Sequence, residues 1–110
     1  MNNQEMYEIA FQIIVHAGES RSLSTEAMDA AEKYDFEKAE ELLKKANDEF
    51  LACHQIQTDM LTSEANGEKN EINVIFIHAQ DHLTMAMMAM DNAKRLVTMY
   101  KKMKEVEVIL

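Results

Sequence analysis

The sequence predicts an all-α protein that folds as a three-helix bundle, and three observations support this fold class. The 110-residue chain contains no proline and only two glycines, so the residues that interrupt helices are nearly absent. Methionine, alanine, glutamate and lysine, which all favour helices, are plentiful. Apolar residues recur every three or four positions along three long segments. We therefore expect one domain over residues 1–110, with helices that run up, down and up.

The first helix is expected from about Gln4 to Glu32. Its buried face is defined by apolar and small residues at steps of three or four, namely Ile9, Ile13, Ala17, Ser20, Leu23, Ala27 and Ala31. Gly18 interrupts this segment at a cost of about 1 kcal/mol relative to alanine. Its presence indicates close packing or a kink at that position.

A short turn over residues 33–35 is expected to lead into the second helix. Asp35 is a good N-cap, because its carboxylate can accept hydrogen bonds from the free amides of the first turn. The apolar line of this helix consists of Phe36, Ala39, Leu42, Leu43, Ala46, Phe50, Cys53, Gln57, Met60 and Leu61. The line fades into the polar stretch 63–70, whose glycine and two asparagines predict the second turn.

The third helix is expected to begin with Asn70 as its N-cap and Glu71 near the positive end of the helix dipole, and to continue to about Lys104. Between residues 72 and 90 it is apolar nearly all round, which a helix packed on one side would not be. One line of residues follows coiled-coil spacing: Val74, Ile77, Asp81, Thr84 and Met88. We therefore expect another copy of the chain to cover this helix.

The charge and the N-terminal sequence exclude several classes of protein. Twenty acidic and eleven basic residues give a formal net charge of -9, which repels nucleic acid and anionic membranes. The first residues lack the pattern of a signal peptide, and no run of about 18 uncharged apolar residues occurs, so we expect a soluble cytoplasmic protein. The single cysteine, Cys53, lies on an apolar helical line and is expected to be a buried structural thiol.

The segment from His78 to His82 places polar side chains inside the apolar third helix, which marks it as the candidate functional site on a buried helix. His78, Asp81 and His82 share one side of that helix, because residues three and four apart are neighbours. A zinc-protease helix needs a glutamate where Ala79 stands, and a di-iron bundle needs a glutamate three residues before a histidine, which none of the four histidines has.

Phosphoryl transfer suits these residues better. A neutral imidazole such as that of His78 is a competent nucleophile near pH 7, and Gln80 and His82 can supply donors for phosphoryl oxygens. Two alternatives stay open from the residues alone. One is a non-catalytic metal-binding helical bundle with His78, Asp81 and His82 as ligands, and the other is a coiled-coil adaptor. His16 and His54 are expected to be structural, and the methionines between residues 85 and 90 to fill the core.

Three blocks of the sequence resemble, in the same order, the enzyme IIA component of the lactose/cellobiose class in the bacterial sugar phosphotransferase system. The blocks are Gly18-Glu19-Ser20-Arg21-Ser22, then Gln57-Thr58 followed by Glu64-Ala65 and Gly67, then Ile77-His78-Ala79-Gln80-Asp81-His82-Leu83. The chain departs from the usual family pattern at Thr84-Met85, where the order of threonine and methionine is reversed.

The resemblance implies a homotrimer that forms a parallel nine-helix bundle. It implies that His78 accepts a phosphoryl group from the histidine-containing phosphocarrier protein and passes it to a cysteine of enzyme IIB, for uptake of cellobiose, lactose or chitobiose through the membrane enzyme IIC. It further implies that Asp81 of three subunits binds a divalent metal ion, expected to be Mg²⁺, on the trimer axis. Gln80 and His82 match flanking positions and are expected to support His78.

Overall fold

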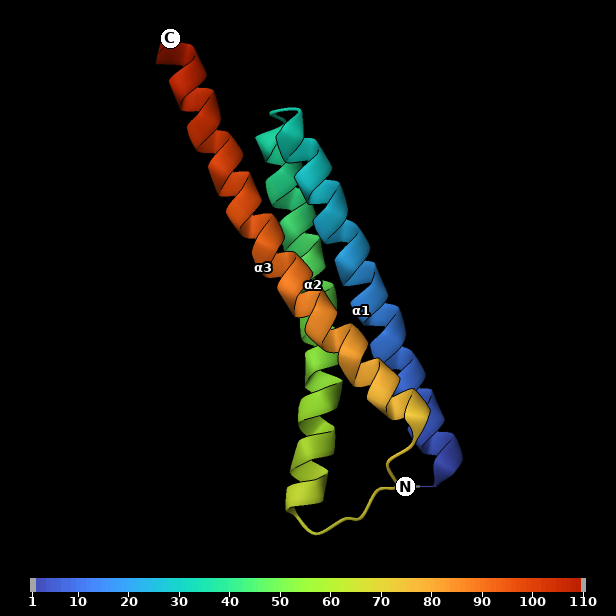
Figure 1. Cartoon of the computed structure of the whole chain (residues 1–110). Coiled ribbons are helices and arrows are strands. Elements are labelled where there is room, and N and C mark those ends of the chain that lie inside the picture. The colour runs from blue at the N-terminus through green and yellow to red at the C-terminus, as the bar shows by residue number, and fades with distance from the viewer. Residues whose placement is uncertain (1, 110) are drawn as a thin grey trace.

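All three predicted helices are present in the computed structural model, which describes residues 2–109 and the side chains of residues 2–107; Met1 and Leu110 lie outside the described part. Helix α1 spans Asn3–Glu32, α2 spans Phe36–Ala65 and α3 spans Val74–Ile109. Figure 1 shows α1 and α2 as an antiparallel hairpin, with α3 packed across them and running beyond their turn. The prediction of an all-α fold with three helices is confirmed.

Side-chain caps fix the beginnings of α1 and α2. Asn2 Oδ1 accepts a hydrogen bond from the Glu5 amide at 2.9 Å, and Asp35 Oδ1 accepts one from the Lys38 amide at 3.3 Å. The predicted cap of the second helix is thus confirmed. Between the two helices, Tyr34 has a φ of 60°, a left-handed conformation that costs a non-glycine residue roughly 1–2 kcal/mol. This conformation lets residues 33–35 reverse the chain.

The core lies along the line where α1 meets the other two helices. The buried face predicted for the first helix is confirmed, since Ile13, Ala17, Ser20, Ala27 and Ala31 are completely buried. Alanine at these contacts lets the helix backbones approach closely. The second and third helices contribute Ala39, Leu42, Leu43, Ala46, Phe50, Cys53 and Met60, and Ala79, Leu83, Ala86, Met90, Ala93 and Val97. Removing their apolar surface from water stabilises the fold by about 25 cal/mol per Å².

Close packing within the chain does not explain Gly18, so that expectation was wrong for the single chain. A Cβ atom built at this position meets nothing within 4 Å, and α1 continues through it without a break. The physical reason is its position on the helix, because Gly18 lies on a side of α1 that neither α2 nor α3 covers.

Helix α3 begins at Val74, and its cap is Asn73 rather than the expected Asn70. Asn73 Oδ1 accepts a hydrogen bond from the amide of Phe76 at 2.9 Å. Asn70 and Glu71 lie in the irregular connection that crosses from the end of α2 to the start of α3 (Figure 1). A helical residue advances 1.5 Å and an extended one about 3.3 Å, so an earlier helix start would shorten this connection's reach. At its other end α3 reaches Ile109, beyond the expected Lys104.

The packing of the three helices is unequal. Helix α1 contacts both other helices extensively, whereas α2 and α3 touch each other sparsely. The resulting bundle is long and narrow, with extents of 62 × 21 × 19 Å. The last turns of α3 are held by Lys101, which pairs with Glu40 at 2.7 Å, and by Lys104, which lies 4.7 Å from the ring centre of Tyr34. Between residues 2 and 109, no helix is long and apolar enough to cross a membrane.

Candidate functional site

His78 and His82 form a contacting pair on one side of α3. Their Nε2 atoms are 3.0 Å apart, and the rings meet edge to face at 83°, with centres 4.4 Å apart. The i, i+4 spacing brings the rings together as expected from the sequence. The expectation of a buried helix is corrected for the single chain: α3 buries Ala79 and Leu83 against α1 and α2, while His78 is exposed and His82 half-buried. An exposed imidazole is accessible to a partner protein.

His82 is held neutral near pH 7. Burial is the main cause that lowers its pKa below the usual 6.5, and the charges of His78 and Arg21 lower it further, while Asp81 opposes them. The Nδ1 atom of His82 is buried without a hydrogen-bond partner. If the proton of the neutral ring is on Nε2, the buried Nδ1 atom carries only an unpaired lone pair. If the proton is on Nδ1, an N–H group is buried without an acceptor, which is rarer in proteins. We therefore assign the donor role in the pair to His82 and the acceptor role to His78.

Gln80 is held by a residue of α2 that was not among the candidate site residues. Gln57 donates its side-chain amide to Oε1 of Gln80, and both side chains are half-buried. The backbone carbonyl of Gln80 also accepts a hydrogen bond from the hydroxyl of Thr84 at 3.1 Å. Beside this contact, a hollow of about 130 Å³ is lined in part by Met60, Asn70 and Phe76. The contact joins the second and third blocks of the family resemblance.

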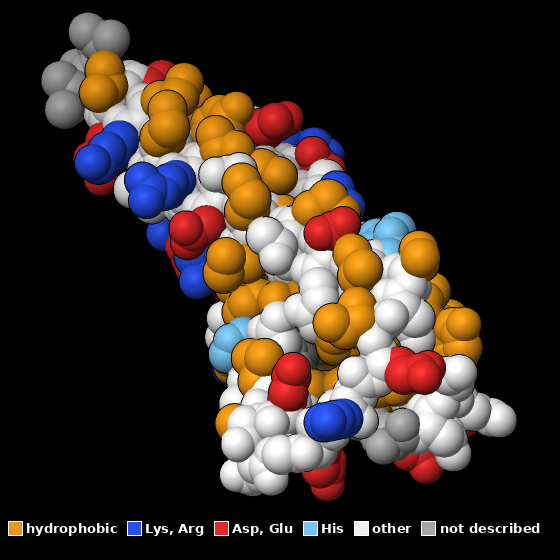
Figure 2. Space-filling view, turned by 60° about the horizontal axis from the view of Figure 1, so that its bottom comes forward, with side chains coloured by type: hydrophobic (Ala, Val, Ile, Leu, Met, Phe, Trp, Pro, Cys, Tyr) orange, Lys and Arg blue, Asp and Glu red, His pale blue; other side chains and the backbone are white. Residues whose placement is uncertain are grey.

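Asp81 lies in an exposed stripe along α3. All members of the predicted coiled-coil line are exposed in the single chain, including Val74 at 83%, Ile77 at 52% and Met88 at 58%. Among the described side chains, Asp81 forms neither a hydrogen bond nor an ion pair. Figure 2 shows that apolar side chains remain at the surface along the molecule. An apolar stripe of this kind is typical of a surface that another protein chain covers.

The methionines near the site were expected to fill the core, and for three of the four this expectation was wrong. Met90 is buried, but Met85, Met87 and Met88 are 40%, 47% and 58% exposed. This part of α3 carries apolar residues on nearly all of its sides, but only one side packs against α1 and α2. The apolar residues on the other sides therefore stay at the surface. Flexible methionine side chains suit a surface that contacts other proteins.

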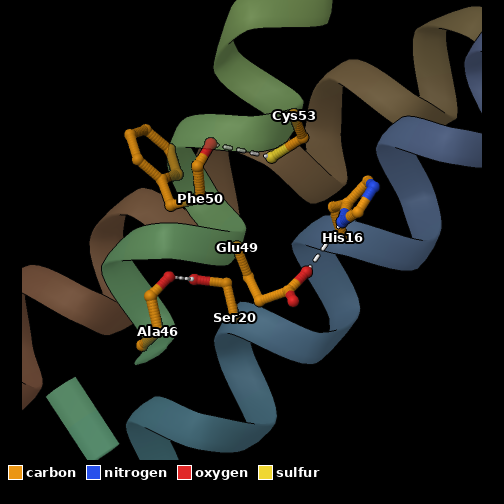
Figure 3. A network of polar contacts seen from close by, with 6 residues as sticks. All are labelled: His16, Ser20, Ala46, Glu49, Phe50 and Cys53. Carbon is orange, nitrogen blue, oxygen red and sulfur yellow. Dashed lines mark hydrogen bonds and ion pairs between the residues drawn. The ribbon is translucent and has the colours of Figure 1, made fainter. Parts of the chain in front are cut away.

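A second set of polar contacts joins α1 to α2 (Figure 3). His16 Nδ1 lies 2.7 Å from Oε2 of Glu49, and the hydroxyl of Ser20 donates to the carbonyl of Ala46 at 2.8 Å. The thiol of Cys53 is completely buried and donates to the carbonyl of Phe50 at 3.2 Å. The structural roles expected for His16 and Cys53 agree with these contacts.

The described side chains of a single chain do not form a metal centre. Among the described side chains, no three His, Cys, Asp or Glu residues are grouped so that they could hold a metal ion. His78 and His82 contact each other directly, and the carboxylate of Asp81 does not join them. The alternative of a metal-binding bundle with these three residues as ligands in one chain therefore has no support.

Comparison with known proteins relates this geometry to a family. The sequence pattern of the family described as "PTS system, Lactose/Cellobiose specific IIA subunit" matches residues 8–101. The lichenan-specific phosphotransferase enzyme IIA component of Bacillus subtilis is 43% identical over 103 residues, which cover 94% of each chain. The lactose-specific EIIA component of Staphylococcus epidermidis is 39% identical over 102 residues, which cover 93% of this chain and 98% of that protein.

Solved structures agree in fold as well as in sequence. The cellobiose-specific enzyme IIA of Bacillus anthracis superposes with a TM-score of 0.88 at 38% identity, over 96% of this chain and 94% of that one. The IIA component in the solution structure of a IIA(chitobiose)–HPr complex superposes with a TM-score of 0.79 at 25% identity, over 90% and 96% of the two chains.

Proposed function

Since the chain belongs to the family of lactose/cellobiose-specific IIA subunits of the sugar phosphotransferase system, we propose that it carries a phosphoryl group on His78. The observation that carries this proposal is the exposed imidazole of His78 in hydrogen-bond contact with the half-buried, neutral His82. A partner protein can reach the ring of His78, and His82 can orient that ring.

The chemistry requires only an exchange of bonds to phosphorus. A ring nitrogen of His78 forms a bond to phosphorus as the phosphorus–nitrogen bond of the donor's phosphohistidine breaks. His78 gives up one ring proton and the leaving imidazole gains one, so protons and charge balance. In the second step a cysteine sulfur attacks phosphorus, the bond to His78 breaks, and His78 regains the proton that the thiol loses. Both steps are nucleophilic substitutions that need no resident cofactor.

His82 acts on the ring nitrogen that it engages. In the resting pair, His82 donates its N–H to Nε2 of His78, which fixes the ring's orientation and the tautomer with a proton on Nδ1. If Nε2 receives the phosphoryl group, the pair must open. The released N–H of His82 is then available to a phosphoryl oxygen, so the same donor serves both states. Gln80, held by Gln57, fixes the turn of α3 that lies between the two histidines.

We infer the partners of this chain from its family. We propose that the histidine-containing phosphocarrier protein supplies the phosphoryl group, in keeping with the HPr complex formed by the chitobiose relative. Enzyme IIB then accepts it on a cysteine, and the membrane enzyme IIC couples it to uptake of a disaccharide such as cellobiose, lactose or chitobiose. The exposed methionines beside the site suit a surface that docks two different partners in turn.

We further propose that three chains assemble through the exposed stripe of α3. This would cover the apolar side chains that the single chain leaves in water and would form a nine-helix bundle. Asp81 is the one charged residue of the predicted line between Val74 and Met88. Three such carboxylates on a common axis provide hard oxygen ligands, the kind that Mg²⁺ prefers, so the residue type fits a shared divalent ion.

The function is tested by phosphorylation with phosphoenolpyruvate, enzyme I and the phosphocarrier protein. The wild-type chain is expected to gain one phosphoryl group, and His78→Ala to gain none while keeping its helix content. His16→Ala and His54→Ala are the matched controls and should accept phosphate, because these side chains lie outside the pair. Phosphate on the His78→Ala variant, measured by mass spectrometry, would refute the assignment.

A further inference from the structure

Arg21 on α1 has no ion-pair partner among the described carboxylates. The side chain is exposed, and among the described residues no acidic group lies within ion-pair distance of its guanidinium. The chain has 20 acidic and 11 basic residues, so acidic partners are plentiful in the sequence. A guanidinium without such a partner is available to another anion.

The contacts of α1 show which way Arg21 faces. The side of α1 that meets α2 is marked by His16, which pairs with Glu49. Another side is marked by Tyr7, which borders a surface hollow together with Ile75 of α3. Arg21 follows Tyr7 by 14 residues, which is close to a whole number of helical turns, so it lies on this second side. Arg21 therefore belongs to the side of α1 near α3.

The same reasoning brings His82 to the facing side of α3. It follows Ile75 by seven residues, close to two turns, so both residues lie toward α1. Ala17 of α1 and Leu83 of α3 belong to one buried apolar cluster, so the stretch of α1 before Arg21 packs in the same part of the core as the stretch of α3 around His82. Helical side chains lean toward the N-terminus of their own helix, so Arg21 leans back toward the level of Ala17.

The electrostatics agree with this geometry. After burial and the charge of His78, the charge of Arg21 is the next cause that lowers the pKa of His82. The guanidinium is thus within electrostatic range of His82.

We propose that Arg21 binds the phosphoryl group carried by His78, a role that rests on the function proposed above. A phosphoryl group on His78 brings up to two negative charges to the site. The charged residue beside the two histidines in the sequence is Asp81, which is also acidic. His82 is neutral and offers a single N–H. The guanidinium supplies a permanent positive charge and planar N–H donors that match phosphoryl oxygens. Arg21 therefore offsets the charge that arrives with the phosphoryl group.

The test compares three variants of the full-length chain in the phosphorylation assay. Arg21→Gln removes the charge, Arg21→Lys keeps it without the planar donors, and Lys45→Gln removes a charge from an exposed position of α2. The readouts are kcat and KM for phosphoryl uptake from the phosphocarrier protein, and the ³¹P chemical shift of the phosphorylated chain. We expect Arg21→Gln to lower kcat roughly tenfold or more, as for loss of one charge-assisted hydrogen bond, and to move the ³¹P signal. Arg21→Lys should recover part of kcat, and Lys45→Gln should match the wild type.

Two results would overturn the role of Arg21 while leaving the proposed function intact. One is an Arg21→Gln variant with wild-type kcat and an unmoved ³¹P signal. The other is a change in KM alone, which would assign Arg21 to docking of the partner. A wild-type chain that accepts no phosphate at all would instead refute the function of His78, and the role of Arg21 with it.

Discussion

The side-chain amide of Gln57 on α2 donates a hydrogen bond to Gln80 on α3, two residues beyond His78. Helices α2 and α3 otherwise touch each other sparsely, so this contact is one of few that link α2 to the helix carrying the site. Both side chains are half-buried, which limits the water that could replace either partner. The contact therefore fixes the turn of α3 from which His78 and His82 project.

Gln57→Ala should lower the free energy of unfolding by about 1 kcal/mol, because Gln80 loses a half-buried partner. It should also slow phosphoryl uptake, since the turn beside His78 is less firmly held. Gln55→Ala is the matched control: Gln55 bonds only to the exposed Asp59, one turn away on the same helix. Urea unfolding and the phosphorylation assay measure both effects. Equal behaviour of the two variants would contradict the role of Gln57.

Asn73→Ala should destabilise the chain by roughly 1 kcal/mol, because the first turn of α3 loses the oxygen that accepts from the Phe76 amide. Asn70→Ala should cost less, since the Oδ1 atom of Asn70 is buried without any hydrogen-bond partner. Thermal unfolding of the two variants, followed by circular dichroism, compares the two asparagines directly. A larger loss for Asn70 would restore it as the cap.

The thiol of Cys53 should make stability depend on pH in the alkaline range. Burial raises its pKa above the ordinary value of 9.0, so the unfolded chain releases this proton at a lower pH than the folded chain. The contribution of Cys53 to the free energy of unfolding is thus fully present below pH 9 and declines as pH rises toward the folded pKa. Cys53→Ala should lack this decline. Urea unfolding at several pH values isolates it as the difference between the two proteins, and parallel curves would rule it out.

Asp81→Leu should remain trimeric in a chelator, whereas the wild-type trimer should weaken when divalent metal is removed. Three carboxylates on one axis repel each other unless a cation neutralises them, and leucine of similar bulk replaces that repulsion with apolar packing. The variant should still accept phosphate on His78, because Asp81 forms no hydrogen bond with His78 or His82 among the described side chains, and these two rings contact each other directly. Sedimentation velocity decides the point: dissociation of the leucine variant into monomers would show that Asp81 is not the repulsive element.

The sequence predicted the start of a helix well where two local signals, the apolar period and a capping residue, agreed. The apolar period and the capping residue agree at Asp35, and α2 begins there. At the start of α3, Asn70 and Asn73 are chemically equivalent caps, so the local sequence does not tell which of them accepts from the first turn, and in the structure it is Asn73. The contact between Gln57 and Gln80 had no signal in the sequence, because periodicity shows which face a residue occupies and not which residue lies opposite.

The site was predicted to a similar extent. The spacing of His78 and His82 on one helix is enough to bring their rings together. The exposure of His78 and the half-burial of His82 in the single chain were not foreseen, because an apolar pattern all round a helix does not tell which of its residues the same chain covers and which another copy covers.

The unequal packing of the helices has a consequence for how the chain folds. Helix α1 takes part in the two large helix–helix interfaces, one with α2 and one with α3. The turn that joins it to α2 consists only of residues 33–35. Loop closure costs least entropy for such near neighbours, so we expect the α1–α2 hairpin to form first and α3 to dock afterwards onto the face of α1. Substitutions in α1 should then slow folding, whereas those on the face of α3 that meets α1 should mainly speed unfolding. We therefore expect the helix that carries His78 to be the last to join the fold and the first to leave it.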